Sequence, residues 1–396
     1  MLIGIKIKKF GLLHELSLGV DLQDLKKMST LSEMRELPTL KPISVFIGQN
    51  ASGKSTFFEA LRFLADAISL NVHIASNQTK HGSYSSLIYN HKPEKYDLEF
   101  ELLYEKKEGV WLHYYLKISS DKFNRPYFSN EKITKYIWLD TCLEKTLLLE
   151  VESKKGKILQ NKKSVNSKEY LPVSLTERKI SAVNIFGHQE EYQDIAYLYY
   201  QITTFFYSDF KQLPKIIDRE QKTGGHKHLN AECSNIKNVV FYLKKQKPQE
   251  FKALQKRLNQ NLRNHNRIDL NRLDKIDNEA QIRYLVLFLI LTDDKPLIAF
   301  DEPDNGLYYE MADSLGLELR DYTLRNQGQQ VFVATHNTNL LDSFSPNEVW
   351  SFDRIQKTGE TDKVSTRYIG ADPVVKAMYK EGIGLGSLWY SGYLDI

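Results

Sequence analysis

Three short apolar runs along the chain each end at polar or charged residues. Residues 43–47 read ISVFI, residues 296–300 read PLIAF, and residues 331–335 read VFVAT. Unbroken runs of this length are typical of strands that are buried on both faces of a parallel sheet. Residues 55–68 follow the first run and place apolar side chains at helical spacing. This alternation of strand and helix predicts an α/β fold with a mainly parallel core sheet.

Alternating apolar and polar positions mark a second kind of strand. Residues 2–10 (LIGIKIKKF) alternate, residues 96–102 alternate apolar with acidic side chains, and residues 110–118 form a further strand after a turn. This period of two predicts an N-terminal antiparallel portion with one face exposed to water. The lysine- and serine-rich residues 152–169 are predicted to form an exposed hairpin or loop. From residue 188 to 265 the pattern becomes helical.

A glycine-rich loop joins the first apolar run to the helical segment after it. Residues 48–55, GQNASGKS, match the pattern G-x-x-x-x-G-K-[ST]. Glycine is needed because backbone N–H groups must converge on phosphate oxygens, and the next helix adds the positive end of its dipole. Lys54 is predicted to reach the β- and γ-phosphates of ATP, and the Ser55 hydroxyl to ligate Mg²⁺. The predicted nucleotide-binding residues are Gly48, Gln49, Asn50, Ala51, Ser52, Gly53, Lys54, Ser55 and Thr56.

Polar side chains follow the other two apolar runs. Asp301 and Glu302 come after one of them, and His336 comes after the other. Taken alone, the carboxylates could face solvent and the histidine could bond a backbone carbonyl. Because ligands gather at the carboxyl ends of parallel strands, their common placement favours a single site with the loop. Asp301 is predicted to hold Mg²⁺, Glu302 to take a proton from an attacking water, and His336 to contact the γ-phosphate or that water.

Composition limits the class of protein and its compartment. The chain has 54 Lys and Arg against 50 Asp and Glu, and a net charge of +4 is too small to indicate nucleic acid by itself. Two cysteines give no disulfide framework, and no apolar stretch reaches the about 18 residues that a bilayer requires. We expect a cytoplasmic protein without a membrane partner. His226, His228 and Cys233 match no zinc spacing, and we interpret them as part of a solvated loop.

The motif residues resemble the ABC-type ATPases of the SMC and DNA-repair branch. The sequence DEPDNGLY (301–308) is similar to the Walker B segment of that branch, and THN (335–337) is similar to its switch-histidine segment. More narrowly, the chain resembles stand-alone bacterial AAA-type ATPases that are found beside nuclease or toxin effectors in anti-phage systems. The segment 232–254 resembles their lid helices and the ending GIGLGSLWYSGYLDI resembles their C-terminus.

The resemblance implies an organisation and a working assembly. It implies an ATPase core at residues 1–66 and 270–396, an antiparallel β portion with the lysine-rich loop at 67–180, and a helical lid or interaction insertion at 181–269. It also implies that ATP hydrolysis needs a homodimer or higher oligomer, in which a signature segment of a second subunit caps the γ-phosphate. Here Asp277 stands where that segment has serine and Glu279 where it has glycine. Because these carboxylates would repel a triphosphate unless Mg²⁺ or Arg283 intervenes, we expect slow turnover.

Three hypotheses for function follow from these residues and from the resemblance, and the effector and the role in defence rest on the resemblance alone. The leading one is a Mg²⁺-dependent ATPase that assembles with itself and regulates a separate nuclease or toxin effector, in defence against phage. The second is a nucleotide-gated scaffold with negligible hydrolysis, which the altered signature segment favours. The third is a DNA-repair or recombination ATPase that acts on DNA, and the near-neutral charge weighs against it. The lysine-rich residues 152–169 offer phosphate contacts to DNA or RNA, although such runs are more often simply solvated.

Overall fold

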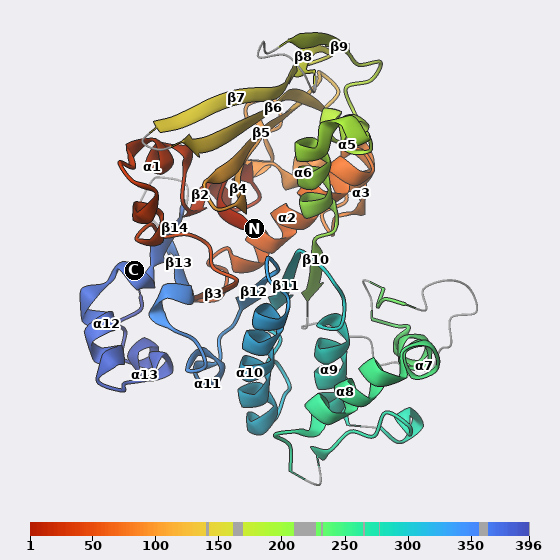
Figure 1. Ribbon diagram of the computed structural model, residues 1–396, viewed down its shortest axis with the longest axis vertical. Helices are drawn as coiled ribbons and strands as arrows, with labels where there is room; N and C mark the ends of the chain where they lie inside the picture. The colour runs from red at the N-terminus through yellow and green to blue at the C-terminus, as the bar shows by residue number, and fades with distance from the viewer. Residues whose placement is uncertain are drawn as a thin grey trace.

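A computed structural model describes residues 1–139, 142–160, 169–209, 227–230, 233–263, 266–276, 278–355 and 363–395. Figure 1 shows an antiparallel sheet at the top of the molecule, a mainly parallel sheet at its centre, and helices around both. This arrangement confirms the predicted α/β fold with an antiparallel portion and a parallel core. The division into an ATPase core, a β portion and an inserted lid remains a prediction.

The antiparallel sheet has eight strands in the described residues, in the order β2-β1-β4-β5-β6-β7-β8-β9. The alternating residues near the N-terminus form β1, and those after residue 96 form β4, as the period of two predicts. Part of the lysine-rich segment forms β8, which pairs with β7 as a hairpin, while its residues 161–168 lie outside the described residues. The strands are β1 (Leu2–Phe10), β2 (Leu13–Gly19), β4 (Leu98–Lys107), β5 (Val110–Ser120), β6 (Pro126–Leu139), β7 (Cys142–Glu152), β8 (Lys155–Leu159) and β9 (Tyr170–Ser174).

The second sheet has six strands in the same described part, in the order β10-β11-β12-β3-β13-β14. Neighbours from β10 to β13 run parallel, and only β14 is antiparallel to its neighbour. Each of the three apolar runs lies in this sheet, with every residue of its strand buried. The strands are β3 (Ile43–Gly48), β10 (Phe206–Asp209), β11 (Leu297–Asp301), β12 (Gln330–Ala334), β13 (Val349–Ile355) and β14 (Lys363–Tyr368).

Helices cover both faces of the parallel sheet. Helix α2 lies between the two sheets, whereas α9 and α10 cover the opposite face of the parallel sheet, and α7 and α8 lie farther out at the lower right of Figure 1. The helices are α1 (Leu22–Lys27), α2 (Lys54–Ser69), α3 (Val72–Gln78), α4 (Tyr84–Leu87), α5 (Ala182–Gly187), α6 (Gln193–Thr203), α7 (Ile236–Gln246), α8 (Pro248–Asn259), α9 (Glu279–Ile290), α10 (Tyr309–Arg325), α11 (Thr338–Leu341), α12 (Pro373–Lys380) and α13 (Leu385–Tyr390).

The helical interpretation of residues 188–265 is wrong for residues 206–209. These residues form β10, which pairs in parallel with β11 and extends the core sheet. The aromatic run 197–207 hides this change, because its residues have apolar side chains in both the helix and the strand. Helix α6 ends at Thr203, and the strand begins three residues later. Apolar content alone does not separate the two periods over so few residues.

The side chains of β3 divide the core between the two faces of the sheet. Phe46 belongs to the cluster that α2 and the antiparallel sheet share, and its ring contacts those of Phe57 and Phe332. Val45 and Ile47 belong to the cluster that includes α9 and α10. Because successive side chains of a strand point to opposite faces, one strand stabilises both layers and fixes the position of the loop that follows it.

Gln330 connects the two sheets through hydrogen bonds that resemble strand pairing. Its side chain is 1% exposed, its Oε1 accepts from the Leu2 backbone N–H at 2.7 Å, and its Nε2 donates to the Leu2 carbonyl at 2.8 Å. The same Nε2 also donates to the Lys41 carbonyl at 3.2 Å. One amide therefore satisfies buried backbone groups of β1 and of the segment before β3.

We expect Gln330→Leu to lower the free energy of unfolding by about 2–3 kcal/mol, because it leaves a buried N–H and carbonyl without their partner. Urea denaturation followed by circular dichroism would measure this change. The matched control is Gln327→Leu, since Gln327 is exposed and its replacement is expected to change the same quantity by less than about 0.5 kcal/mol. Equal unfolding midpoints for the two variants would contradict the bridging role of Gln330.

Candidate functional site

The glycine-rich loop connects β3 directly to α2. Gly48 and Gly53 both adopt positive φ angles, of 135° and 107°. A Cβ atom at Gly48 would lie 2.0 Å from the backbone oxygen of Phe352 on the adjacent strand. Glycine is therefore required at this turn by conformation and by space. The sixteen-residue α2 begins at Lys54, so the N-terminal N–H groups of a long helix face the loop.

Lys54 is held inside the loop. Lys54 is only 5% exposed. Its Nζ donates to the carbonyls of Gly48 at 2.8 Å and Gln49 at 2.9 Å. The Nζ atom also donates to Ser52 Oγ at 3.3 Å. These contacts place a cation at the centre of the loop, where its ammonium group has oxygen partners that a phosphate could replace.

The strand register brings the three motif segments to one edge of the sheet. Asp301 at the end of β11 is opposite Ala334 at the end of β12, and Ala334 is opposite Phe46 near the end of β3. Because these strands are parallel, the residues that follow them meet at the carboxyl edge. A cavity of about 70 Å³ lies there. It is lined by Leu12, Asn50, Ala51, Ser52, Gly53, Lys54, Ser55, Thr56, Glu302 and His336.

This cavity brings together most of the residues that the sequence singles out. Glu302 and His336, which are 34 positions apart and more than 240 positions after the loop, share its wall with Lys54. Gly48, Gln49 and Asp301 are outside its lining, although Gly48 and Gln49 hold Lys54 and Asp301 precedes Glu302. Leu12, from the turn between β1 and β2, also lines the cavity, and the sequence patterns do not identify it.

Glu302 and His336 contact each other just after the carboxyl ends of β11 and β12. His336 Nε2 lies 3.6 Å from Glu302 Oε1. Glu302 has a positive φ of 52°, which is uncommon for a side chain of this size, and its N–H donates to the Ala334 carbonyl at 2.8 Å. The planes of the His336 ring and of the Trp389 ring from α13 are inclined by 27°, and their centroids are 6.4 Å apart. Both side chains are therefore oriented by the ends of strands rather than by long loops.

A partly buried aspartate, Asp304, links the two loops that carry these side chains. Asp304 Oδ1 accepts from Thr335 Oγ1 at 2.7 Å, and the Asn337 N–H donates to the same hydroxyl oxygen at 2.9 Å. Burial raises the pKa of the Asp304 carboxyl above its ordinary value. Since Thr335 and Asn337 flank His336, this network fixes the histidine loop against the loop that contains Glu302.

Asp301 has a partner that sequence reasoning missed. The Tyr207 hydroxyl, on β10, lies 3.4 Å from Asp301 Oδ2, and Asp301 itself is 1% exposed. Burial, and then the charge of Asp301, raise the pKa of the Tyr207 hydroxyl, so this hydroxyl keeps its proton and donates. The sequence gives no indication of this contact, because a helical interpretation of residues 206–209 does not align Tyr207 with β11.

The donor set fits a Mg²⁺–nucleotide. Two glycines leave the loop backbone open to phosphate, Lys54 supplies a cation, and the start of α2 supplies N–H groups. For the metal, the Ser55 hydroxyl lines the cavity and the Asp301 carboxylate precedes Glu302 at the same strand end. Oxygen ligands of this kind are those that Mg²⁺ prefers.

The structure describes only part of the segment around residues 277–279, which was compared with the signature motif. Asp277 lies outside the described residues, so its role stays a prediction. Glu279 opens α9, is 74% exposed at its side chain, and accepts from Arg283 Nη2 at 2.8 Å. Arg283 also donates from Nη1 to the Asn305 carbonyl at 3.3 Å. Arg283 thus neutralises Glu279 within the same chain and connects α9 to the loop after β11.

The other candidate groups stay apart from this cavity. His226 lies outside the described residues, whereas His228 Nδ1 contacts Asp293 Oδ1 at 2.7 Å, and burial raises the pKa of Cys233 to about 11. Within the described ranges, no group of three or more His, Cys, Asp or Glu side chains is placed to hold a metal ion. Across those same residues, no helix combines the length and the apolar character that crossing a membrane requires.

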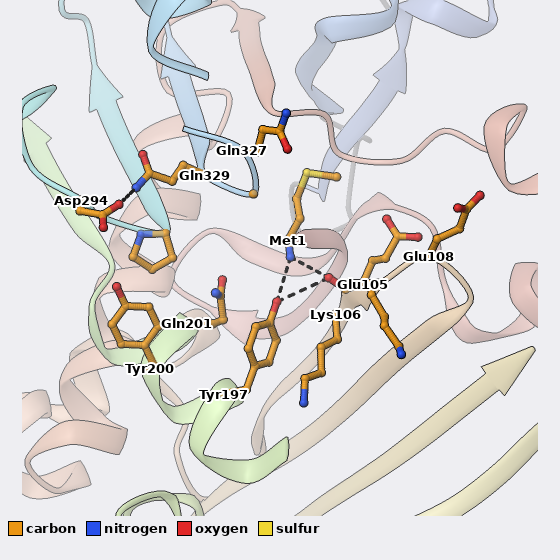
Figure 2. Close-up of a pocket in the computed structure, with 13 residues that line it drawn as sticks. Met1, Glu105, Lys106, Glu108, Tyr197, Tyr200, Gln201, Asp294, Gln327 and Gln329 are labelled. Carbon is orange, nitrogen blue, oxygen red and sulfur yellow. Dashed lines mark hydrogen bonds between the residues drawn. The ribbon is translucent and has the colours of Figure 1, made fainter. Parts of the chain in front are cut away.

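A larger cavity, of about 670 Å³, lies at the opposite edge of the parallel sheet. Figure 2 shows Tyr197 and Tyr200 of α6 on one side of it and the loops carrying Asp294 and Gln329 on the other, with the Gln329 amide donating to Asp294. Gln329 directly precedes β12, so this cavity faces the amino ends of the strands. The cavity lined by the motif residues is smaller and lies at the carboxyl ends of the strands, so the predicted nucleotide site is not the larger of these two cavities.

Comparisons with known proteins identify the family of the chain. A family model described as "AAA domain, putative AbiEii toxin, Type IV TA system" matches residues 43–342, which include the glycine-rich loop, Asp301, Glu302 and His336. No curated protein matches the chain. Among solved structures, the SMC head domain from Thermotoga maritima is 10% identical, with 92% of this chain and 98% of that chain covered and a TM-score of 0.44.

Two further solved structures are similar at the same distant level. The SMC head bound to the C-winged helix domain of ScpA is 11% identical, with 93% of this chain and 97% of that chain covered and a TM-score of 0.46. A nucleotide-free ATP-binding cassette from an ABC transporter is 12% identical, with 96% and 99% covered and a TM-score of 0.35. Since the family model spans most of the chain, the protein belongs to this AAA-domain family.

Proposed function

We propose that the protein binds ATP with Mg²⁺ and hydrolyses it to ADP and phosphate. The observation that carries this proposal is the meeting of Lys54, Glu302 and His336 in one cavity at the carboxyl edge of the parallel sheet. A phosphate-binding loop alone supports binding, whereas a carboxylate and an imidazole beside it supply groups that can act on an attacking water.

Each residue of the site has a proposed role. The loop N–H groups from Gly48 to Thr56 and the Lys54 ammonium bind the phosphates. Ser55 and Asp301 hold Mg²⁺, which when bound offsets negative charge on the phosphate oxygens, and Tyr207 orients Asp301 by donating to it. Glu302 orients the water and accepts its proton, and His336 donates to the γ-phosphate. Asp304 and Thr335 keep the histidine loop in place.

We further propose that the chain works as a homodimer or higher oligomer that regulates a separate effector. In one chain, the cavity at the glycine-rich loop measures only about 70 Å³, and in this proposal a second subunit completes the site. The family description, which names a putative toxin of a type IV toxin–antitoxin system, supports a connection with a toxin. A nuclease as the effector and a role in defence against phage rest on the resemblance alone. Co-expression with the product of the adjacent gene would test this, with toxicity expected to differ between wild type and Lys54→Ala.

Lys54→Ala tests the ATP-binding proposal. Because Lys54 is the cation held at the centre of the loop, we expect the variant to bind ATP at least about tenfold more weakly, which corresponds to about 1.4 kcal/mol. Isothermal titration with ATP and Mg²⁺ measures this difference. Lys376→Ala is the matched control, because Lys376 is exposed on α12 and does not line the cavity, and its replacement is expected to leave the affinity unchanged.

The same protein samples also test hydrolysis and assembly. Phosphate release per protein molecule is expected to rise with protein concentration, because the working form contains more than one chain. It is also expected to stop when Mg²⁺ is removed with a chelator. Wild-type protein that retains ATP at one molecule per chain without releasing phosphate would support the nucleotide-gated scaffold instead. Equal ATP affinity of wild type and Lys54→Ala would contradict both.

A further inference from the structure

Positive charge is concentrated in one part of the chain. Residues 237–276 contain eleven lysines and arginines against three aspartates and glutamates, whereas the whole chain has a net charge of only +4. The remainder of the chain is therefore net acidic. These residues form α7, α8 and the segment after them, at the edge of the molecule (Figure 1). A charge asymmetry of this kind favours a polyanionic partner.

A groove of about 640 Å³ lies within this basic part, between α7 and residues 270–274; we refer to it as the α7 groove. Lys237, Phe241, Lys244 and Lys245 line it from α7, at spacings that place them on one face of the helix. The lining of the groove also includes Leu270, which is buried. The groove is thus lined by both basic and apolar side chains.

Phe241 is unusual among the apolar residues of α7. It is 57% exposed, whereas Val239, Val240 and Leu243 of the same helix are buried in the core. Lys245 Nζ lies 4.4 Å from the centroid of the Phe241 ring. An aromatic face that solvent can reach, with a cation against it, is an arrangement that can stack on a nucleobase.

The lysines of the groove differ from the arginines near them. Arg257 of α8 pairs with Glu318 of α10, and Arg263, which follows α8, pairs with Glu310 of α10. In the part of the chain that the structure describes, no carboxylate lies within salt-bridge distance of Lys237, Lys244 or Lys245. Asp274 also lines the groove, but the three lysines outnumber it. Their charge is therefore available to a ligand.

We propose that the α7 groove binds single-stranded nucleic acid, with a base stacked on Phe241 and phosphates bound by Lys237, Lys244 and Lys245. Lys237 and Lys245 each lie four residues from Phe241 along the helix. Four residues of helix rise by about 6 Å, which is roughly the length of two stacked nucleotides. An acidic polypeptide would use the lysines equally well, but it would gain nothing from a base-stacking ring. The proposal does not depend on ATP hydrolysis, because the groove lies on α7 and away from the glycine-rich loop.

The test is fluorescence anisotropy of a labelled oligodeoxythymidylate of about 20 nucleotides, titrated with the full chain in the absence of ATP. We expect Phe241→Ala to weaken binding by about tenfold at every salt concentration, because one base loses its stacking partner. We expect the double variant Lys244→Ala/Lys245→Ala to reduce the slope of log affinity against log salt by about 1.4, since about 0.7 is lost per phosphate contact.

Two controls separate the site from general effects of charge and folding. Phe241→Trp keeps an aromatic face and is expected to keep the affinity. Lys376→Ala/Lys380→Ala removes two exposed charges from α12 and is expected to leave the affinity and the salt slope near those of wild type. The proposal is overturned if wild type does not bind the oligonucleotide, if Phe241→Ala binds as tightly as wild type, or if polyglutamate of equal charge displaces the oligonucleotide as effectively as unlabelled oligonucleotide does.

Discussion

Replacing Glu302 by glutamine is expected to lower the rate of phosphate release from ATP by about 10²–10⁴-fold, the range typical for loss of a positioned general base. Glutamine keeps the size of the side chain and one oxygen near His336, but it cannot accept the proton of an attacking water. ATP binding should persist, because the phosphate contacts come from the loop and Lys54. A sensitive phosphate-release assay, together with retention of labelled ATP, measures both quantities.

The control for this variant is Glu190→Gln, which removes the same charge from an exposed position outside the cavity. Its phosphate release is expected to equal that of wild type. If Glu302→Gln also releases phosphate at the wild-type rate, Glu302 is not the base, and the contact with His336 is only structural. If neither protein releases phosphate while both retain ATP, the scaffold hypothesis accounts for the site better than the ATPase hypothesis does.

The sequence predicts where the side chains around this cavity lie, because they directly follow three apolar runs that are easily recognised as strands. The three apolar runs become β3, β11 and β12, and a parallel strand that is buried on both faces is mainly apolar until it ends. The first polar residues after each run therefore appear at one edge of the sheet. That geometric rule is enough to bring Glu302 and His336 to the cavity of Lys54, although they are far apart in the chain.

The features that the sequence does not predict depend on packing between distant segments. Tyr207 contacts Asp301 only because residues 206–209 form an edge strand, and four residues are too few to display a period. Leu12 lines the cavity because a turn of the antiparallel sheet reaches it. Arg283 turns toward Glu279 and the Asn305 carbonyl, a choice of partner that side-chain identity alone does not decide.

The largest effect on stability is expected from Glu131→Ala, at about 4 kcal/mol of unfolding free energy. Glu131 is fully buried on β6, where its carboxylate accepts from the Tyr114 hydroxyl at 2.9 Å, from the Ser181 hydroxyl at 2.6 Å, and from the Ala182 N–H. Alanine leaves those three buried donors without an acceptor, at about 1–3 kcal/mol each before relaxation. The result would be loosening of α5, which begins at Ala182, from the antiparallel sheet.

The unfolding free energy should depend on pH in a direction that reveals the titration of the Glu131 carboxyl. Packing of the side chain alone would not produce this dependence. Burial raises the pKa of Glu131 above its ordinary value of 4.5, so the folded protein binds this proton more tightly than the unfolded chain does. Its contribution to the unfolding free energy therefore decreases as the pH rises from 4.5 through the raised pKa. Glu131→Gln retains the volume and cannot titrate, so the difference in stability between wild type and this variant should change over that pH range. A difference that stays constant from pH 4 to 8 would mean that Glu131 has the same pKa in the folded and unfolded states, and that its burial carries no electrostatic cost.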